Sequence, residues 1–230
     1  MIIADLQKLT TIDFPDHLAC TVFTFGCNFR CGFCHNPELV LAKKNNSRIK
    51  EEFVFNFLNR RRGILEGVVI TGGEPTLQED LLKFMEKIKN LGFKVKLDTN
   101  GTNPFILKEG LKKKLIDYIA MDLKSSLEQY EKVVNAKLDT SKIKESIDVI
   151  RNSEINYEFR TTILPSIHNI GEVNKMTELI KGSKRYVLQK FVVSKLIDSK
   201  FKKEPSPSSN FLQKIKDSVA KNVNIVEIRE

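Results

Sequence analysis

Short apolar segments and longer amphipathic segments alternate along most of the chain. The apolar segments are rich in β-branched and aromatic residues and predict strands at residues 18–25, 67–71, 93–98, 118–121, 156–164 and 186–193. Between them, apolar residues recur at helical spacing and predict helices at about 50–62, 77–91, 104–116, 143–150 and 173–180. This alternation implies right-handed crossovers and therefore a parallel sheet.

The number of repeated units limits the architecture. About six strand–helix units are present where a closed barrel needs eight, so we predict an α/β fold of the incomplete (β/α)6, TIM-like barrel type. A Pro- and Ser-containing turn at residues 204–209 precedes a helix near 211–219 and a short strand near 223–228. We therefore divide the chain into a core domain, residues 1–203, and a C-terminal helix and strand, residues 204–230, packed on the same domain.

Polar signatures follow the ends of successive predicted strands. They are a cysteine-rich segment at residues 27–34, Gly-Gly-Glu-Pro at 72–75, Asp-Thr-Asn-Gly at 98–101 and Asp-Leu-Lys at 122–124. In parallel α/β folds, ligands bind at the edge formed by the carboxyl ends of the strands. We therefore expect these segments to contribute to one site.

The cysteines favour a metal site. Cys27, Cys31 and Cys34 have C-x3-C-x2-C spacing, whereas Cys20 lies in an apolar run and is expected to be a buried apolar side chain. Three thiolates from one loop can hold three corners of a cubane iron–sulfur cluster, and the missing fourth cysteine leaves a coordination position open for catalysis. Two alternatives stay open at this point: a zinc site with His35 as the fourth ligand, and an accidental cluster of free thiols.

Composition and charge indicate the class of protein in which this metal site is found. Hydrophobic residues make up 41% and charged residues 29% of the 230, ordinary values for a globular protein. No apolar run is long enough to span a membrane and the first residues lack a signal-peptide pattern, so we expect a cytoplasmic protein without a membrane partner. The net charge of +9 fits a lysine-rich surface or a basic face for an acidic protein. We find no nucleic-acid recognition motif.

The cysteine segment follows the first predicted strand and has the aromatic Phe33 just before its last cysteine. In this it resembles the signature of the radical S-adenosylmethionine (SAM) superfamily. The resemblance implies that Cys27, Cys31 and Cys34 bind one [4Fe-4S] cluster whose fourth iron chelates SAM, and that the barrel is of the radical SAM type. One electron would cleave the sulfonium and yield a 5′-deoxyadenosyl radical, so no side chain need act as a catalytic acid, base or nucleophile.

Other segments carry the same resemblance. Gly72, Gly73 and Glu74 match an element that contacts the SAM amino group, because glycines permit close backbone approach and Glu74 offers a negative charge. The resemblance implies further cofactor contacts from Phe33, His35, Thr99, Asn100, Asp122, Lys124 and Arg160. Within this set Lys124 would meet the SAM carboxylate, and Asp122 a polar group or a monovalent cation.

From the residues alone, these segments also have simpler interpretations. Residues 72–75 could be only a turn that starts a helix. Lys124 could face solvent, Asp122 could cap the following turn, and Arg160 could form a surface ion pair.

Nearly the whole chain resembles the activating enzymes of glycyl-radical enzymes. Residues 9–15 precede the first predicted strand as they do in that group. Residues 24–31 and 34–38 are most similar to the longer type of anaerobic ribonucleoside-triphosphate reductase activating proteins, and pyruvate formate-lyase activases share residues 34–36. The latter carry a histidine that contacts the SAM ribose where this chain has Gln189, so the ribose contact stays open. No eight-cysteine insertion is present, so one cluster per chain is expected.

The resemblance implies an enzyme whose substrate is a glycine of a partner protein, an anaerobic ribonucleotide reductase in the first instance. A low-potential donor such as flavodoxin or ferredoxin would supply the electron. Two other functions stay open: a radical SAM enzyme for a small molecule such as a pterin or deazapurine precursor, and a non-catalytic metal-binding module.

Overall fold

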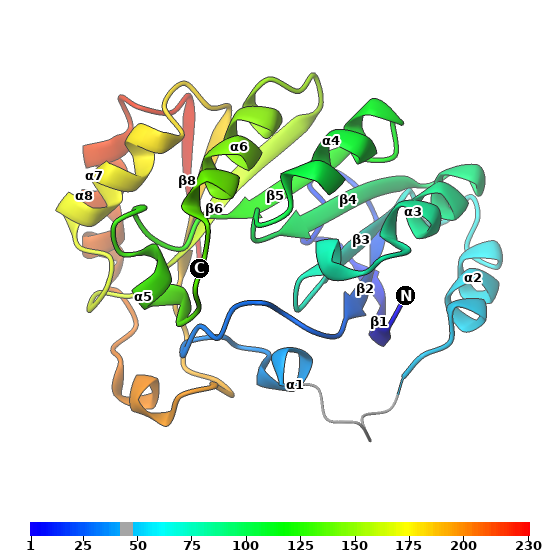
Figure 1. The fold of residues 1–230 in the computed structure, drawn as a ribbon, viewed down its shortest axis with the longest axis horizontal. Helices are drawn as coiled ribbons and strands as arrows, with labels where there is room; N and C mark the ends of the chain where they lie inside the picture. The colour runs from blue at the N-terminus through cyan, green and yellow to red at the C-terminus, as the bar shows by residue number, and fades with distance from the viewer. Residues whose placement is uncertain (42–47) are drawn as a thin grey trace.

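The computed structural model describes residues 1–41 and 48–230, and its strands form one sheet in the order of the chain, β1 to β8 (Figure 1). β1 is antiparallel to β2, and each later strand runs parallel to the strand before it. The strands are β1 (Ile3–Thr10), β2 (Ala19–Thr24), β3 (Gly67–Gly72), β4 (Lys94–Thr99), β5 (Tyr118–Asp122), β6 (Asn156–Ile163), β7 (Arg185–Lys190) and β8 (Ile225–Arg229).

The longer helices connect the parallel strands and cover one face of the sheet (Figure 1). They are α2 (Glu51–Asn59), α3 (Leu81–Asn90), α4 (Pro104–Lys112), α6 (Thr140–Arg151), α7 (Ile170–Leu179) and α8 (Ser209–Val219). Short helical segments lie in the described parts of the loops: α1 (Pro37–Val40), η1 (Pro75–Leu77), α5 (Tyr130–Val134) and η2 (Ser199–Lys203). In the described residues no helix combines the length and apolarity needed to cross a membrane.

The predicted fold class is confirmed, with three differences in detail. β1 was not predicted, because few residues of its sequence are buried and it presents no apolar run. The helix expected at 77–91 begins only at Leu81, since a separate 3-10 turn occupies residues 75–77. The strand expected at 186–193 ends at Lys190. After it the chain leaves the sheet to cross the cysteine segment, where the Asp198 N–H donates to the Gly32 carbonyl at 2.9 Å, and Val192 and Val193 are exposed.

The two faces of the sheet are packed differently. The face under the helices carries the main apolar core, to which Cys20 belongs as predicted. On the other face, strand residues and Phe14, from the loop between β1 and β2, form a small separate apolar cluster. Its members are Phe14, Ala19, Val69, Tyr118 and Ala120. The polar side chains of the same face begin beside this cluster, where Lys96 and Glu158 pair in register with Tyr118 and Ala120, and continue to the carboxyl ends of the strands.

Candidate active site at the carboxyl ends of the strands

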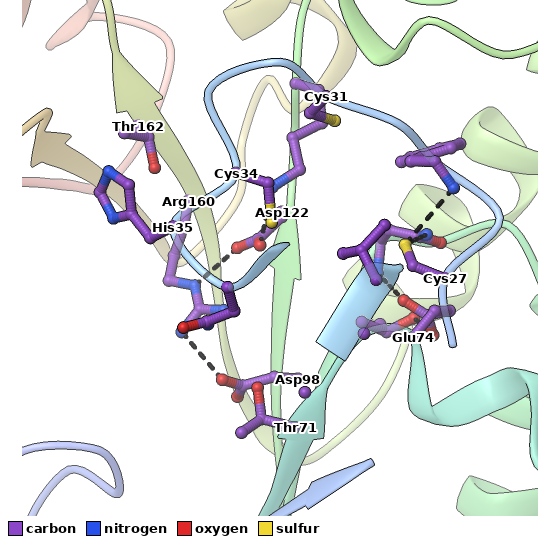
Figure 2. Close-up of a pocket in the computed structure, with 18 of the residues that line it drawn as sticks. Cys27, Cys31, Cys34, His35, Thr71, Glu74, Asp98, Asp122, Arg160 and Thr162 are labelled. Atoms are coloured by element: carbon purple, nitrogen blue, oxygen red, sulfur yellow. Dashed lines mark hydrogen bonds and ion pairs between the residues drawn. The ribbon is translucent and has the colours of Figure 1, made fainter. Parts of the chain in front are cut away.

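A cavity of about 260 Å³ opens at the carboxyl ends of β2 to β7 (Figure 2). Every site residue predicted from the sequence lines it: Cys27, Cys31, Phe33, Cys34, His35, Gly72, Gly73, Glu74, Thr99, Asn100, Asp122, Lys124 and Arg160. Asp98 and Gln189 also line it, as do Thr71 and Thr162, which were not singled out from the sequence. The four segments expected to share one site therefore do so.

Contacts from distant segments hold the cysteine loop, residues 25–36. The Arg30 N–H donates to the Val134 carbonyl of α5 at 2.8 Å, and the Phe29 ring lies 6.2 Å from the ring of Tyr130. On the other side, the ring of Phe33 packs edge-on against Phe201 of η2 at 5.9 Å. Backbone and aromatic contacts thus fix the loop without using its thiols.

The thiols of this loop are free and largely shielded from water. Burial raises the pKa of Cys27 to about 11 and that of Cys31 to about 12, so both are protonated at neutral pH. The Phe29 N–H donates to the Cys27 sulfur at 3.4 Å. Binding of iron would have to displace the thiol protons, which makes cluster uptake dependent on pH. The described residues contain no group of three His, Cys, Asp or Glu side chains arranged around a single metal ion.

The imidazole of His35 also lines the cavity, and one of its nitrogens makes no hydrogen bond to the described residues. Its Nε2 atom is buried and has no hydrogen-bond partner among the described residues. Burial, with a smaller contribution from the Lys124 charge, lowers its pKa, and the ring packs 5.5 Å from that of Phe191. A buried polar atom without a partner indicates that a ligand would complete the site.

Gly72 and Gly73 bring the end of β3 against the start of the cysteine loop. A Cβ atom on Gly72, whose φ is +124°, would lie 2.3 Å from the Thr24 nitrogen, and one on Gly73 would lie 2.0 Å from the Gly26 oxygen. Without these Cβ atoms, the Gly73 N–H donates to the Thr24 carbonyl at 3.0 Å and the Glu74 N–H to the Gly26 carbonyl at 2.7 Å. The glycines are therefore required for packing of the two segments.

The Glu74 carboxylate, only 1% exposed, joins the ends of β3 and β4. Its Oε1 accepts from the Thr76 N–H at 3.1 Å, the Thr76 hydroxyl at 2.6 Å and the Thr99 hydroxyl at 2.8 Å, while Oε2 accepts from the Asn100 N–H at 2.6 Å. Burial raises its pKa, and these donors oppose the rise. The carboxylate expected to face an ammonium group is thus already held by protein donors.

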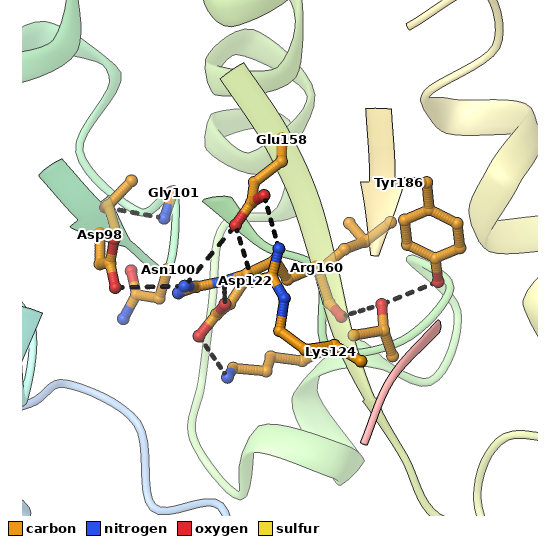
Figure 3. A network of polar contacts seen from close by, with 12 residues as sticks. Asp98, Asn100, Gly101, Asp122, Lys124, Glu158, Arg160 and Tyr186 are labelled. Atoms are coloured by element: carbon orange, nitrogen blue, oxygen red, sulfur yellow. Dashed lines mark hydrogen bonds and ion pairs between the residues drawn. The ribbon is translucent and has the colours of Figure 1, made fainter. Parts of the chain in front are cut away.

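The side of the cavity opposite the cysteine loop is formed by an ion-pair network centred on Arg160, which we call the ion-pair wall (Figure 3). Its Nε donates to Asp122 Oδ1 at 2.8 Å and its Nη1 to Asp98 Oδ2 at 3.2 Å, and the Lys124 ammonium donates to Asp122 Oδ2 at 3.0 Å. Burial by itself would raise the pKa of Asp122, but Arg160 and Lys124 outweigh it and lower that pKa. These side chains are 12–29% exposed, so the interpretations of Lys124 as solvent-facing and Arg160 as a surface ion pair are wrong.

The network continues below the cavity, towards the amino ends of the strands. Glu158 is fully buried and accepts from Arg229 at 3.2 and 3.3 Å and from the Tyr118 hydroxyl at 3.2 Å. Lys96, 1% exposed, pairs with Asp98. Glu158 was missed at the sequence level, although its alternation with the apolar Tyr157 and Phe159 was a visible sign of a strand with one polar face.

Residues 21–180 match the radical SAM superfamily, and the chain belongs to that superfamily. It is therefore a radical SAM enzyme, and membership implies a [4Fe-4S] cluster and SAM as cofactors. The alternatives of a zinc site, a chance thiol cluster and a non-catalytic module do not agree with this assignment.

Two curated relatives differ in what they act on. A proposed glycyl-radical enzyme activating enzyme of Methanocaldococcus jannaschii is 33% identical over 233 residues, which cover 99% of this chain and 95% of the relative. A 7-carboxy-7-deazaguanine synthase of Thermococcus kodakarensis is 27% identical over 187 residues, covering 71% of this chain and 70% of the relative.

Solved structures confirm the fold at low sequence identity. SuiB of Streptococcus suis, bound to SAM, has a TM-score of 0.67 and 13% identity over 90% of this chain, which spans about half (49%) of SuiB. A domain of a pyruvate-formate lyase-activating enzyme of Bacteroides vulgatus has a TM-score of 0.55 and 16% identity, covering 71% of this chain and 99% of that domain.

Proposed function

We propose that this protein activates a glycyl-radical enzyme, with an anaerobic ribonucleotide reductase as the first candidate. With one electron from a donor, the bound cluster and SAM would supply a 5′-deoxyadenosyl radical, with methionine as the other product, and a glycine of the partner would give a hydrogen atom to that radical. The proposal rests on one observation: two different sets of side chains face each other across one cavity. Three free thiols of a single loop stand on one side, and a buried ion-pair network stands on the other.

The residues present suit these cofactors. Cys27, Cys31 and Cys34 would hold the cluster, and the absence of a fourth cysteine in the loop suits an iron that also binds a substrate. The unpartnered Nε2 of His35 offers one hydrogen bond to a bound group. The Lys124 ammonium would attract the SAM carboxylate, and Asp122 would keep that ammonium in place or bind a monovalent cation.

Similarity supports a protein substrate. The relative named as a glycyl-radical enzyme activating enzyme matches this chain nearly end to end, whereas the 7-carboxy-7-deazaguanine synthase matches over 71% of it. We also propose a low-potential acidic donor, a flavodoxin or ferredoxin, because the chain carries a net charge of +9.

The test starts from anaerobically reconstituted protein. We expect it to bind iron, to cleave SAM to 5′-deoxyadenosine after reduction with dithionite, and to produce a glycine-centred radical in a candidate reductase, detected by electron paramagnetic resonance. The Cys31→Ala variant is the control and should do none of these. SAM cleavage without a glycine signal in any candidate partner would reject the activase while leaving the radical SAM enzyme intact.

The second candidate, an enzyme for a small molecule, is favoured by one observation, the similarity to the deazaguanine synthase. Incubation of the reduced enzyme and SAM with pterin and deazapurine precursors, followed by mass spectrometry, would reveal a product. A product formed at a rate above that of glycine activation would replace the first proposal with this one.

A further inference from the structure

The backbone of Lys124 is clamped by two buried side chains that do not line the cavity. The Lys124 N–H donates to the Tyr130 hydroxyl at 3.3 Å, and the Lys124 carbonyl accepts from the His168 ring at 2.9 Å. Tyr130 and His168 are both fully buried. Because the lysine stem is flexible, the place of its ammonium is set jointly by the fixed backbone and by Asp122, whose carboxylate accepts from it at 3.0 Å.

The hydrogen bonds of His168 define its tautomer. A backbone N–H can only donate, so the bond from the Leu164 N–H to Nδ1 at 3.1 Å shows that Nδ1 carries no proton. Nε2 therefore carries the proton and donates it to the Lys124 carbonyl. Both ring nitrogens are used by the backbone, one at the end of β5 and one at the end of β6, so the ring joins the two loops.

The residues that follow Lys124 are held from the same side. Glu172, in the first turn of α7, accepts from the Ser125 hydroxyl at 2.7 Å and from the Ser126 N–H at 2.8 Å. On the other side of the loop, Tyr130 contacts Phe29 of the cysteine loop, with the ring centres 6.2 Å apart. The segment that carries Lys124 is therefore fixed both to β6–α7 and to the cysteine loop.

We propose that His168 is a positioning residue: by holding the Lys124 carbonyl, it keeps the Lys124 ammonium at the place where it attracts the carboxylate of bound SAM. This inference rests on the proposed function, because it assumes that SAM occupies the cavity. His168 itself acts only through Lys124. Neither of its nitrogens is free to contact a ligand, and it is not among the residues that line the cavity.

Two conservative variants separate positioning from folding. His168→Asn keeps an acceptor near Nδ1 for Leu164 but loses the donor to Lys124, whereas His168→Gln keeps a donor near Nε2 and loses that acceptor. Both remove the ring, so both should lower the unfolding temperature. We expect His168→Asn to weaken SAM binding about tenfold, the value of one lost hydrogen bond of about 1.4 kcal/mol, and His168→Gln to stay within about threefold of the native protein.

Binding is measured by equilibrium titration of the reconstituted, unreduced protein with SAM, followed by the change in its absorption spectrum. Amide hydrogen exchange supplies a readout that needs no cofactor: residues 123–127 should exchange faster in His168→Asn than in His168→Gln. Ser208→Ala is the matched control, since Ser208 caps α8 through the Phe211 N–H at 3.2 Å and neither lines the cavity nor contacts the segment that carries Lys124. It should lower the unfolding temperature and leave SAM affinity unchanged.

A double-mutant cycle decides whether the effect passes through Lys124. In the Lys124→Met background, His168→Asn should cause no further loss of affinity. Equal affinity of the Asn and Gln variants, or an undiminished loss in the Lys124→Met background, would overturn the positioning role. Failure of the native protein to bind SAM would instead reject the proposed function, so the two outcomes are distinct.

Discussion

The two walls of the cavity differ in how complete they are within the polypeptide. On the side of β4 to β6, every charged side chain of the network has an opposite charge beside it, and Arg160 contacts both Asp98 and Asp122. On the side of the cysteine loop, the buried thiols are protonated and the Nε2 atom of His35 lacks a partner among the described residues. The charged groups on the side of β4 to β6 find their partners within the polypeptide. The groups on the side of the cysteine loop obtain theirs only when a cofactor binds.

This difference predicts where mutations act. Changes in the ion-pair wall should reduce the stability of the protein before any cofactor is added, because a buried charge without its partner is costly. Changes to the thiols of the cysteine wall should leave the polypeptide folded and abolish cofactor binding. Four predictions test the contrast.

The largest effect is expected from Cys31→Ala. Loss of a direct ligand should exceed the effect typical of outer partners of a metal site, so SAM cleavage should fall by more than about 100-fold and the iron content should drop with it. Cys20→Ala is the control, since Cys20 is fully buried in β2 and away from the cavity; it should keep its iron. Loss of iron in both variants would show that damage to the apolar core, and not removal of an iron ligand, causes the loss.

Arg160→Met should destabilise the protein without cofactors by about 3–5 kcal/mol, because Asp98 and Asp122 would lose a shared buried partner. Urea unfolding measures the change. In Arg185→Met, which breaks a pair with Glu227 whose side chains are 34% and 43% exposed, the loss should stay below about 1 kcal/mol. Equal losses in the two variants would contradict the description of the ion-pair wall as a buried unit.

Gly73→Ala should displace the cysteine loop, because the new Cβ would lie 2.0 Å from the Gly26 oxygen. We expect a loss of about 1–3 kcal/mol together with reduced cluster uptake. Gly171→Ala places a methyl group in α7 with its nearest neighbour, the side-chain oxygen Asn169 Oδ1, at 3.3 Å; a small shift of that side chain accommodates it, so stability should change by less than about 1 kcal/mol and cluster uptake should not change. Normal cluster uptake by Gly73→Ala would show that the loop does not depend on this contact.

The smallest effect concerns acid stability. Burial lowers the pKa of His168 from 6.5 to about 4, and Lys124, Glu172 and Glu204 are the charged groups beside it. Between these two values the unfolded chain binds a proton that the folded chain does not, so this contribution is full above pH 6.5 and is lost as pH falls towards 4. From about pH 7 to pH 5, native protein should lose about 2 kcal/mol more than His168→Gln in urea unfolding. Equal losses of unfolding free energy in the native protein and in His168→Gln would contradict the lowered pKa of His168.

Much of this site could be predicted from the sequence because its residues come in short segments, each next to a predicted strand. The cysteine loop, residues 72–75 and residues 122–124 each follow a strand directly, so predicting the strands placed them on one edge. Their surroundings were harder. His168 acts on the carbonyl of a residue 44 positions earlier, and backbone acceptors leave no mark in the sequence. The polar face of β6 did leave a mark, an alternation of Glu158 and Arg160 with apolar residues.

The close fit of Gly73 against Gly26 also bears on protein engineering. The cysteine loop and the turn at residues 72–75 are separated in sequence by α1, α2 and β3, yet each leaves room for the backbone of the other. A cysteine loop transplanted into a different barrel would need the glycine pair of the neighbouring strand to travel with it. The two segments are best treated as one transferable unit.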